Sequence, residues 1–202
     1  SGPCEAGFYC LGGSALPNPM DGVVGNICPR GHFCPAGSSS PSPCPPGFFL
    51  AHRGGQSEQD CQPCFPGWFC SRRGQSSPEG LPLECPAGYY CPSGTKAANQ
   101  YPCPEGTYSN QTRLGSARQC QPCPGGTFCA SAGLGKTTSE GPCSAGYHCP
   151  PGQVSAPPAP HRCPRGFYCP LGSASPVPCE SGTYQSQEGK DLCDLCPAGL
   201  FC

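Results

Sequence analysis

The spacing of the cysteines constrains this chain more than any other feature of its sequence. Eight segments have the form Cys-x5-Cys, and three more begin in the same way but close after a longer loop. These eleven modules account for all 22 cysteines, and each has a glycine three residues after its first cysteine. An internal repeat of this kind is considered first, because missing it would misassign the whole fold.

The modules also suggest how the cysteines pair. The eight short modules are Cys4–Cys10, Cys28–Cys34, Cys64–Cys70, Cys85–Cys91, Cys123–Cys129, Cys143–Cys149, Cys163–Cys169 and Cys196–Cys202. The three long modules are Cys44–Cys61, Cys103–Cys120 and Cys179–Cys193. The simplest prediction is one disulfide inside each module. The alternative is a crossed register at the Cys-x2-Cys junctions, such as Cys61–Cys70 with an offset partner for Cys64, and sequence alone leaves both open.

A second regularity concerns the position two residues after each module glycine, which we call the slot. Ten of the eleven slot residues are aromatic and the remaining one is histidine. They are Tyr9, Phe33, Phe49, Phe69, Tyr90, Tyr108, Phe128, His148, Tyr168, Tyr184 and Phe201. Aromatic rings bury a large apolar area. The pattern therefore predicts a small core in each module, in which one ring covers one disulfide and neighbouring rings stack.

Side chains that build a large core are scarce. Ile, Val, Leu and Phe together make up only 25 of 202 residues. So few apolar side chains do not offset the entropy lost on folding, and cross-links must supply the difference. We therefore predict small disulfide-rich repeats, in an elongated rod of tandem cysteine-rich modules with short β-hairpins and little regular secondary structure. Short strands are expected at 48–51, 107–109 and 183–185.

The modules fall into five groups along the chain. Residues 1–43 hold two short modules, and residues 44–84 hold a long and a short one. Residues 85–142 and 163–202 each form a short-long-short unit, and residues 143–162 hold one extra short module. Repeat units of this kind contact mainly their neighbours, so the main partners of each module are expected to be adjacent modules.

Composition and motifs argue against several classes of function. A net charge of −1 gives no electrostatic case for nucleic acid, and no apolar run approaches the roughly 20 residues of a membrane span. The Cys-x2-Cys pairs lie too far apart for a four-ligand zinc site. We interpret His32, His52, His148 and His161 as surface or ring-packing residues. No catalytic grouping stands out, so we expect no enzyme, no metal site and no cofactor.

Two kinds of glycan site are predicted. Asn110-Gln111-Thr112 is an N-glycosylation sequon, so Asn110 is expected to carry a glycan. A proline-rich stretch supplies the candidate O-glycan acceptors Ser38, Ser39, Ser40 and Ser42. Dense cysteine usage indicates an oxidising compartment, so we expect an extracellular location, either secreted or in a cell-surface ectodomain.

One combination of residues resembles a known family. The segment Cys103-Pro104-Glu105-Gly106-Thr107-Tyr108, followed by Cys120-Gln121-Pro122-Cys123-Pro124-Gly125-Gly126, is similar to the ephrin-receptor-like cysteine-rich repeat. That repeat is related to tumour necrosis factor receptor and EGF-like modules. The resemblance extends over essentially the whole chain, although the Cys-x5-Cys closure is shorter than the commoner form. It implies an extended, disulfide-laddered extracellular rod within a large multidomain protein.

Two functions are consistent with these patterns. The first is a non-enzymatic structural segment of a large extracellular repeat protein, a stiff rod that self-associates as the shaft of an extracellular filament. The alternative is a ligand-binding or adhesive ectodomain segment of a receptor, which presents loops such as Arg72-Arg73 or 157–162 to other extracellular proteins. The even spread of aromatic residues favours the first function, because binding hot spots cluster in one place.

Overall fold

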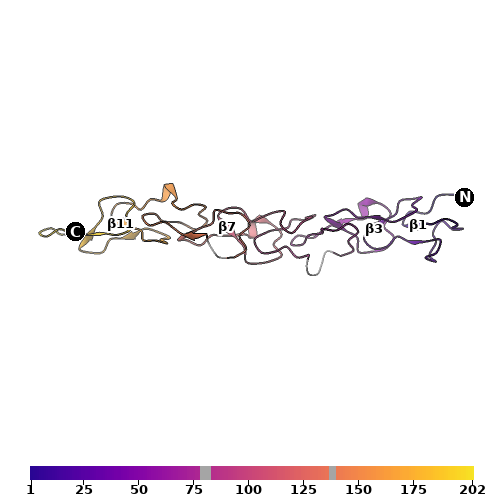
Figure 1. Cartoon of the computed structure of the whole chain (residues 1–202), viewed down its shortest axis with the longest axis horizontal. Helices are drawn as coiled ribbons and strands as arrows, with labels where there is room; N and C mark the ends of the chain where they lie inside the picture. Colours follow the sequence, from indigo (N-terminus) through magenta and orange to yellow (C-terminus); the bar gives the residue numbers. More distant parts are fainter. Residues whose placement is uncertain (78–82, 137–139) are drawn as a thin grey trace. The chain divides into compact units, whose positions relative to one another are not determined.

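The fold is described from a computed structural model, for residues 1–77, 83–136 and 140–202. Among these residues there is no α-helix, and the regular structure consists of strands of two or three residues and three short 3-10 helices. The strands form seven two-stranded antiparallel sheets. Figure 1 shows these short strands joined by irregular chain. The prediction of small disulfide-rich repeats with short hairpins and little regular secondary structure is confirmed.

Each sheet is a hairpin of two strands that follow each other in the chain. The pairs are β1 (Phe8–Cys10) with β2 (Gly25–Ile27), β3 (His32–Phe33) with β4 (Ser42–Pro43), β5 (Phe48–Phe49) with β6 (Gln62–Pro63), β7 (Thr107–Tyr108) with β8 (Gln121–Pro122), β9 (Thr127–Phe128) with β10 (Gly141–Pro142), β11 (Phe167–Tyr168) with β12 (Val177–Pro178), and β13 (Thr183–Tyr184) with β14 (Asp194–Leu195). The 3-10 helices are η1 (Glu58–Asp60), η2 (Ala117–Gln119) and η3 (Ala159–His161). The three segments expected as strands contain β5, β7 and β13.

One register is common to all the hairpins. We number the modules 1 to 11 in chain order. The slot residue of a module lies opposite the residue that stands two positions before the first cysteine of the next module, which we call its cross-strand partner. Tyr9 pairs in this way with Asn26, and Tyr168 with Val177. Each hairpin therefore leads the chain from one module directly into the next.

A tight turn precedes the slot in each module. In module 3, the amide of Phe48 donates to the carbonyl oxygen of Pro45 at 3.1 Å, which closes a turn around Gly47. Gly47 has φ +89°, and the eleven module glycines have φ values between +76° and +89°. A type II turn needs a positive φ at its third residue, and only glycine adopts this conformation without a steric penalty. This requirement explains the glycine in every module.

A second turn follows in modules 1 to 10 and ends at what we call the tail position, where φ is positive in every case. In module 2, the tail residue is Gly37, with φ +82°, and the amide of Ser38 donates to the carbonyl of Pro35 at 3.1 Å. In the long modules, the tail position lies ten residues after the first cysteine. Gly54 and Gly189 occupy it in modules 3 and 10, but Arg113 occupies it in module 6, with φ +66°.

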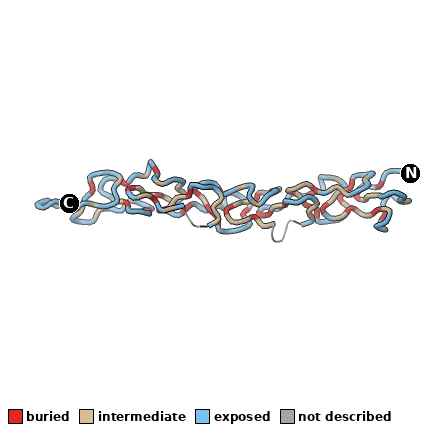
Figure 2. Tube along the Cα trace, in the orientation of Figure 1, coloured by how far each residue is buried: buried red, intermediate tan, exposed pale blue. Residues whose placement is uncertain are grey.

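The contacts between residues divide the chain into two compact units. Unit 1 comprises Ser1–Pro86, Tyr90–Tyr101 and Thr112–Ser116, and unit 2 comprises Ala87–Tyr89, Pro102–Gln111 and Ala117–Cys202. In both units most of the buried apolar residues are cysteines, so buried positions occur as short stretches along the trace (Figure 2). The disulfides therefore occupy the place of a conventional core. The five groups of modules inferred from the sequence stay predictions.

Candidate functional site: a ladder of disulfides and backbone hydrogen bonds

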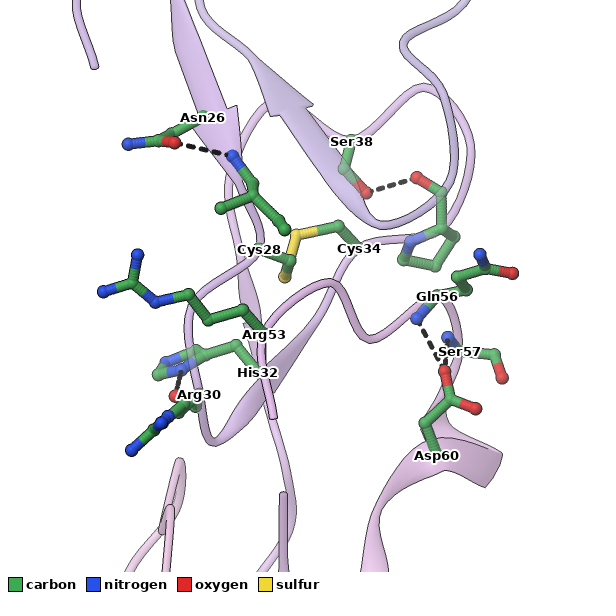
Figure 3. The surroundings of a disulfide bond; sticks show 12 residues. Asn26, Cys28, Arg30, His32, Cys34, Ser38, Arg53, Gln56, Ser57 and Asp60 are labelled. Carbon is green, nitrogen blue, oxygen red and sulfur yellow. Dashed lines mark hydrogen bonds between the residues drawn. A yellow bond between two sulfur atoms is a disulfide. The ribbon is translucent and has the colours of Figure 1, made fainter. Parts of the chain in front are cut away.

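Every module contains its own disulfide. Eleven bridges join the first and last cysteines of the eleven modules, with Cα atoms 5.8 to 6.2 Å apart. These separations lie in the usual range for disulfides, about 4.4 to 6.8 Å. Figure 3 shows one of them, Cys28–Cys34, surrounded by backbone turns. The bridges in this structure join the same cysteines as the local alternative described above, which stays a prediction for the protein in solution.

Consecutive modules are also joined by a repeated set of four backbone hydrogen bonds. In modules 7 and 8 these run from Gly126 N to Cys149 O at 2.8 Å, from Cys143 N to Gly126 O at 2.8 Å, from Gly152 N to Cys123 O at 2.9 Å and from Cys129 N to Gln153 O at 2.9 Å. The module glycine is thus both a donor and an acceptor. All eight participating groups belong to the main chain, so the set does not depend on side chains.

The same set recurs along both units. All four bonds link each successive pair among modules 1 to 5 through residues of unit 1, and each successive pair among modules 6 to 10 through residues of unit 2. A hydrogen bond of this kind contributes a net stability of about 0.5 to 1.5 kcal/mol. It also satisfies buried main-chain groups that would otherwise carry a desolvation cost. Because every module offers the same donors and acceptors, the ladder repeats in spite of the variable sequence between modules.

Contacts reach beyond the adjacent module. A Cβ atom added to Gly47 in module 3 would lie 2.6 Å from the carbonyl oxygen of Gly94, the tail residue of module 5. A Cβ added to Gly106 in module 6 would lie 2.5 Å from the carbonyl oxygen of Gly152 in module 8. Real Cβ atoms do not approach oxygen so closely. The sequence predicted contacts mainly between neighbours, and this second-neighbour contact is an addition to that expectation.

The slot rings cover disulfides, but not those expected from the sequence. Phe49 is 3% exposed and packs against the Cys64–Cys70 bridge of the following module. Phe33 likewise packs against Leu50 and the Cys44–Cys61 bridge of the module that follows it. The prediction of one ring over one bridge in each module is met in module 3 by Phe48, which packs against Cys44–Cys61, whereas Phe33 and Phe49 reach the bridge of the following module. The reason is the hairpin, which pairs the slot strand with the residues leading into the next module.

Stacking between rings is local. The aromatic pairs are Phe49 with Phe65 at 5.3 Å, Tyr90 with Tyr101 at 5.6 Å and His148 with His161 at 5.1 Å between ring centroids. Such pairs contribute about 0.5 to 1.5 kcal/mol beyond the area that they bury. The expected stacking between slot rings of neighbouring modules does not occur in these three pairs, because each slot residue meets a residue outside the slot.

Arg113 makes the most unusual contact in unit 1. Its guanidinium lies 4.5 Å from the centre of the Trp68 ring, and its Nε lies 3.9 Å from a carboxylate oxygen of Glu84. A non-glycine residue in the left-handed region costs about 1 to 2 kcal/mol. The cation–π contact with a ring that is 9% exposed offsets part of this cost. Sequence reasoning missed this site, although an arginine at a tail position that otherwise holds glycine was a usable signal.

One carboxylate stabilises the end of a long module. The Asp60 carboxylate accepts hydrogen bonds from the amides of Gln56 at 2.6 Å and Ser57 at 3.1 Å (Figure 3). These two amides hold the pKa of Asp60 below its ordinary value of 3.8. The ionised form of Asp60 therefore fixes the loop that leads through η1 to Cys61.

The predicted glycan sites lie in loops. Asn110 is exposed, and the Ser109 hydroxyl oxygen accepts a hydrogen bond from the Gln111 amide at 3.1 Å, so the chain turns at the sequon. Among the candidate O-glycan acceptors, Ser39 and Ser40 are exposed, Ser38 and Ser42 are half-buried, and the Ser38 hydroxyl donates to the carbonyl of Pro35 at 2.6 Å. These sites stay predictions.

The arginine loop named in the alternative function borders a depression in unit 1. Its volume is about 380 Å³, and Arg72 and Arg73 line it together with Phe69, Gln75 and Leu83. The floor is thus partly apolar, and the two arginines are exposed. The other predicted loop, 157–162, contains η3 and His161.

None of the helices in residues 1–77, 83–136 and 140–202 is both long enough and apolar enough for a membrane span. Over the same residues, no group of three or more His, Cys, Asp or Glu side chains is arranged to hold a metal ion.

The repeated geometry defines the chain as a cysteine-rich repeat array. Residues 166–201, which include modules 10 and 11 almost completely, match the family described as tyrosine-protein kinase ephrin type A/B receptor-like. This match confirms the ephrin-receptor-like resemblance seen in the sequence. A search of curated proteins finds no match to the chain.

Proposed function

We propose that this chain is a non-enzymatic structural segment of an extracellular protein, in which tandem modules act as a stiff spacer. The observation that carries the proposal is the four-bond ladder between consecutive modules, reinforced by the close approach of Gly106 to Gly152 two modules away. Each module is held by a covalent bridge and by two levels of neighbour contact. Bending at one junction must therefore break several interactions at once.

The extracellular location rests on the disulfides and on the family match. Eleven bridges persist only where the environment is oxidising, as in secreted proteins and ectodomains. The matched family is described as receptor-like. Partners of this segment are accordingly extracellular, and its adjacent modules are its first partners.

Small-angle X-ray scattering on the intact chain tests the proposal. We expect the profile of a stiff, elongated particle, with a constant maximum dimension across a range of salt concentrations. The reduced and alkylated chain is the control and should give the profile of a flexible polymer. A native profile that is compact, or as flexible as that of the reduced chain, would contradict the spacer function.

The filament shaft is a finer version of the same function and stays a prediction. It requires contacts between copies, whereas the ladder described above lies within one chain. Electron microscopy of the native protein distinguishes the two versions, because fibrils appear only if copies associate.

A second candidate function is a ligand-binding ectodomain. The observation that favours it is the depression lined by Arg72, Arg73 and Phe69, because exposed arginines beside an apolar floor suit an acidic protein segment. Under this candidate, labelled chain binds cells saturably, and the double variant Arg72→Glu/Arg73→Glu loses that binding. The matched control is Arg30→Glu, another exposed arginine. Equal binding by all three proteins excludes this depression.

A further inference from the structure

At two places the slot residue and its cross-strand partner are both ring side chains of the same type. The amide of Tyr90 donates to the carbonyl of Tyr101 at 2.9 Å, and the amide of His148 donates to the carbonyl of His161 at 3.0 Å. The ring centroids are 5.6 Å apart in the tyrosine pair and 5.1 Å apart in the histidine pair. Module 8 thus has two imidazoles where module 5 has two phenol rings, on the same backbone scaffold.

The histidine pair can therefore become positively charged in mild acid, whereas the tyrosine pair stays neutral. Tyrosine keeps its proton up to about pH 10, whereas histidine ordinarily gains a proton near pH 6.5. Two imidazolium rings at the separation of His148 and His161 repel each other. The tyrosine pair experiences no such change between neutral and mildly acidic pH.

The environment of His148 makes protonation of its imidazole less favourable. Its Nδ1 atom is buried and has no hydrogen-bond partner within the described part of the chain. Burial, followed by the charge of His161, lowers the pKa of His148 from the ordinary value of 6.5, and outweighs a hydrogen bond to the His161 main chain that favours the proton. A protonated Nδ1 would carry a desolvated N–H, which is unfavourable in a buried position.

Within the described part of the chain, no carboxylate forms an ion pair that would compensate for this charge. The Glu140 carboxylate of module 7 accepts hydrogen bonds from the Ala130 amide and the Ser131 hydroxyl instead. On the following modules the charged groups are Arg162, Arg165, Glu180, Glu188, Lys190, Asp191 and Asp194. Among the residues that the structure describes, none of these groups forms an ion pair with either imidazole.

We propose that the His148–His161 hairpin is an acid-sensitive joint, closed when both imidazoles are neutral and opened when both are protonated. Opening breaks the bond between His148 and His161 and loosens the adjacent bond from Cys149 N to Ser173 O. The disulfides on both sides, Cys143–Cys149 and Cys163–Cys169, stay intact. The joint therefore loosens one edge of the contact between two rigid modules, while the bonds that Gly146 makes to Cys163 and Cys169 remain and acid does not unfold either module.

Proton linkage gives the direction in which the stability of the closed hairpin changes with pH. The closed hairpin binds a proton at His148 less tightly than the open one does, so its stability is complete above pH 6.5 and declines as the pH falls below that value. An extracellular segment meets neutral pH outside the cell and acidic pH after uptake. The hairpin would thus be closed at neutral extracellular pH and open at the acidic pH met after uptake.

Amide hydrogen exchange by NMR on the intact chain tests the proposal, with the tyrosine hairpin as an internal reference. The measured quantity is the protection factor of the His148 amide divided by that of the Tyr90 amide, from pH 7.4 to pH 5.0. We expect the ratio to fall as the pH drops below 6.5, because protonation then favours the open hairpin. A ratio that stays constant overturns the proposal.

Variants assign the effect to the pair. The double variant His148→Tyr/His161→Tyr recreates the tyrosine hairpin, and its ratio should be independent of pH. His32→Tyr is the matched control and should retain the acid response. If the double variant also responds to acid, another group is responsible and the proposal fails. The unmodified chain gives a further check, because a His148 ring that titrates at the ordinary 6.5 also contradicts the joint.

Discussion

The amide nitrogen of Cys123 donates a hydrogen bond to the carbonyl oxygen of Gly106 at 2.8 Å. In every module after the first, the first cysteine donates the same bond to the glycine of the preceding module. Gly106 has φ +76° and faces the carbonyl oxygen of Gly152, which leaves no room for a side chain. One glycine thus serves the turn, the ladder and the second-neighbour contact.

Gly106→Ala should be more destabilising than Gly182→Ala. Both glycines have a positive φ, +76° and +85°, so each substitution costs about 1 to 2 kcal/mol in backbone strain. Only at Gly106 would the new Cβ also collide with a neighbouring carbonyl, whereas nothing lies within 4 Å at Gly182. Amide exchange across the neighbouring modules measures the difference. Equal losses in the two variants would refute the steric role of the second-neighbour contact.

Arg113→Gly should uncover Trp68 without unfolding the module. Glycine removes the left-handed strain of about 1 to 2 kcal/mol but also removes the guanidinium 4.5 Å from the indole. Trp68 is the single tryptophan, so acrylamide quenching of its fluorescence reports this site alone. We expect stronger quenching with little change in thermal stability. Arg30→Gly serves as the control, and unaltered quenching in Arg113→Gly would show that the contact does not shield the ring.

Asp60→Asn should loosen the loop before Cys61. The pKa of Asp60 is lowered by the amides of Gln56 and Ser57, so its stabilisation is present above pH 3.8 and is lost as the pH falls through the lowered value. We expect faster exchange of these two amides in the variant at neutral pH, by a few-fold. Wild type should approach the variant only in strong acid. Glu58→Gln, in the same 3-10 helix, is the control and should exchange like wild type at neutral pH.

Non-reducing peptide mapping should recover eleven bridges, each within one module. The decisive junctions are the Cys-x2-Cys pairs, because Cys61 and Cys64 are close enough in sequence to exchange partners. Local pairing yields one peptide containing Cys64–Cys70 and another linking Cys44 to Cys61. A peptide that links Cys61 to Cys70 would establish the crossed register instead.

Asn110 should carry an N-glycan when the chain passes through a secretory pathway. The side chain is exposed at a turn, so the acceptor is accessible. Digestion with a peptide N-glycosidase should lower the mass of the protein by one glycan and convert Asn110 to Asp. Asn110→Gln should already have the lower mass. A wild-type mass that the enzyme leaves unchanged would rule out occupancy.

Sequence predicted the parts of this fold that depend on single residues in fixed positions. Module limits follow from the cysteines, and the turns follow from glycines such as Gly47, because positive φ strongly favours that residue. The packing of Phe49 on the bridge of the next module was not predictable, because it depends on how hairpins place one module against another. The Arg113–Trp68 contact was missed for the same reason, since its partners are far apart in sequence.

Module 8, the extra short module between two otherwise similar groups, is bonded to modules 7 and 9 through the same main-chain atoms as its relatives. An array with such junctions can lengthen by duplication of about 20 codons, because the duplicated module carries a matching set of donors and acceptors on both sides. Only the modules beside the insertion then acquire a different second neighbour, and each of these still meets a carbonyl in the same place. Evolution can therefore adjust the reach of this segment in steps of one module, without compensating mutations elsewhere.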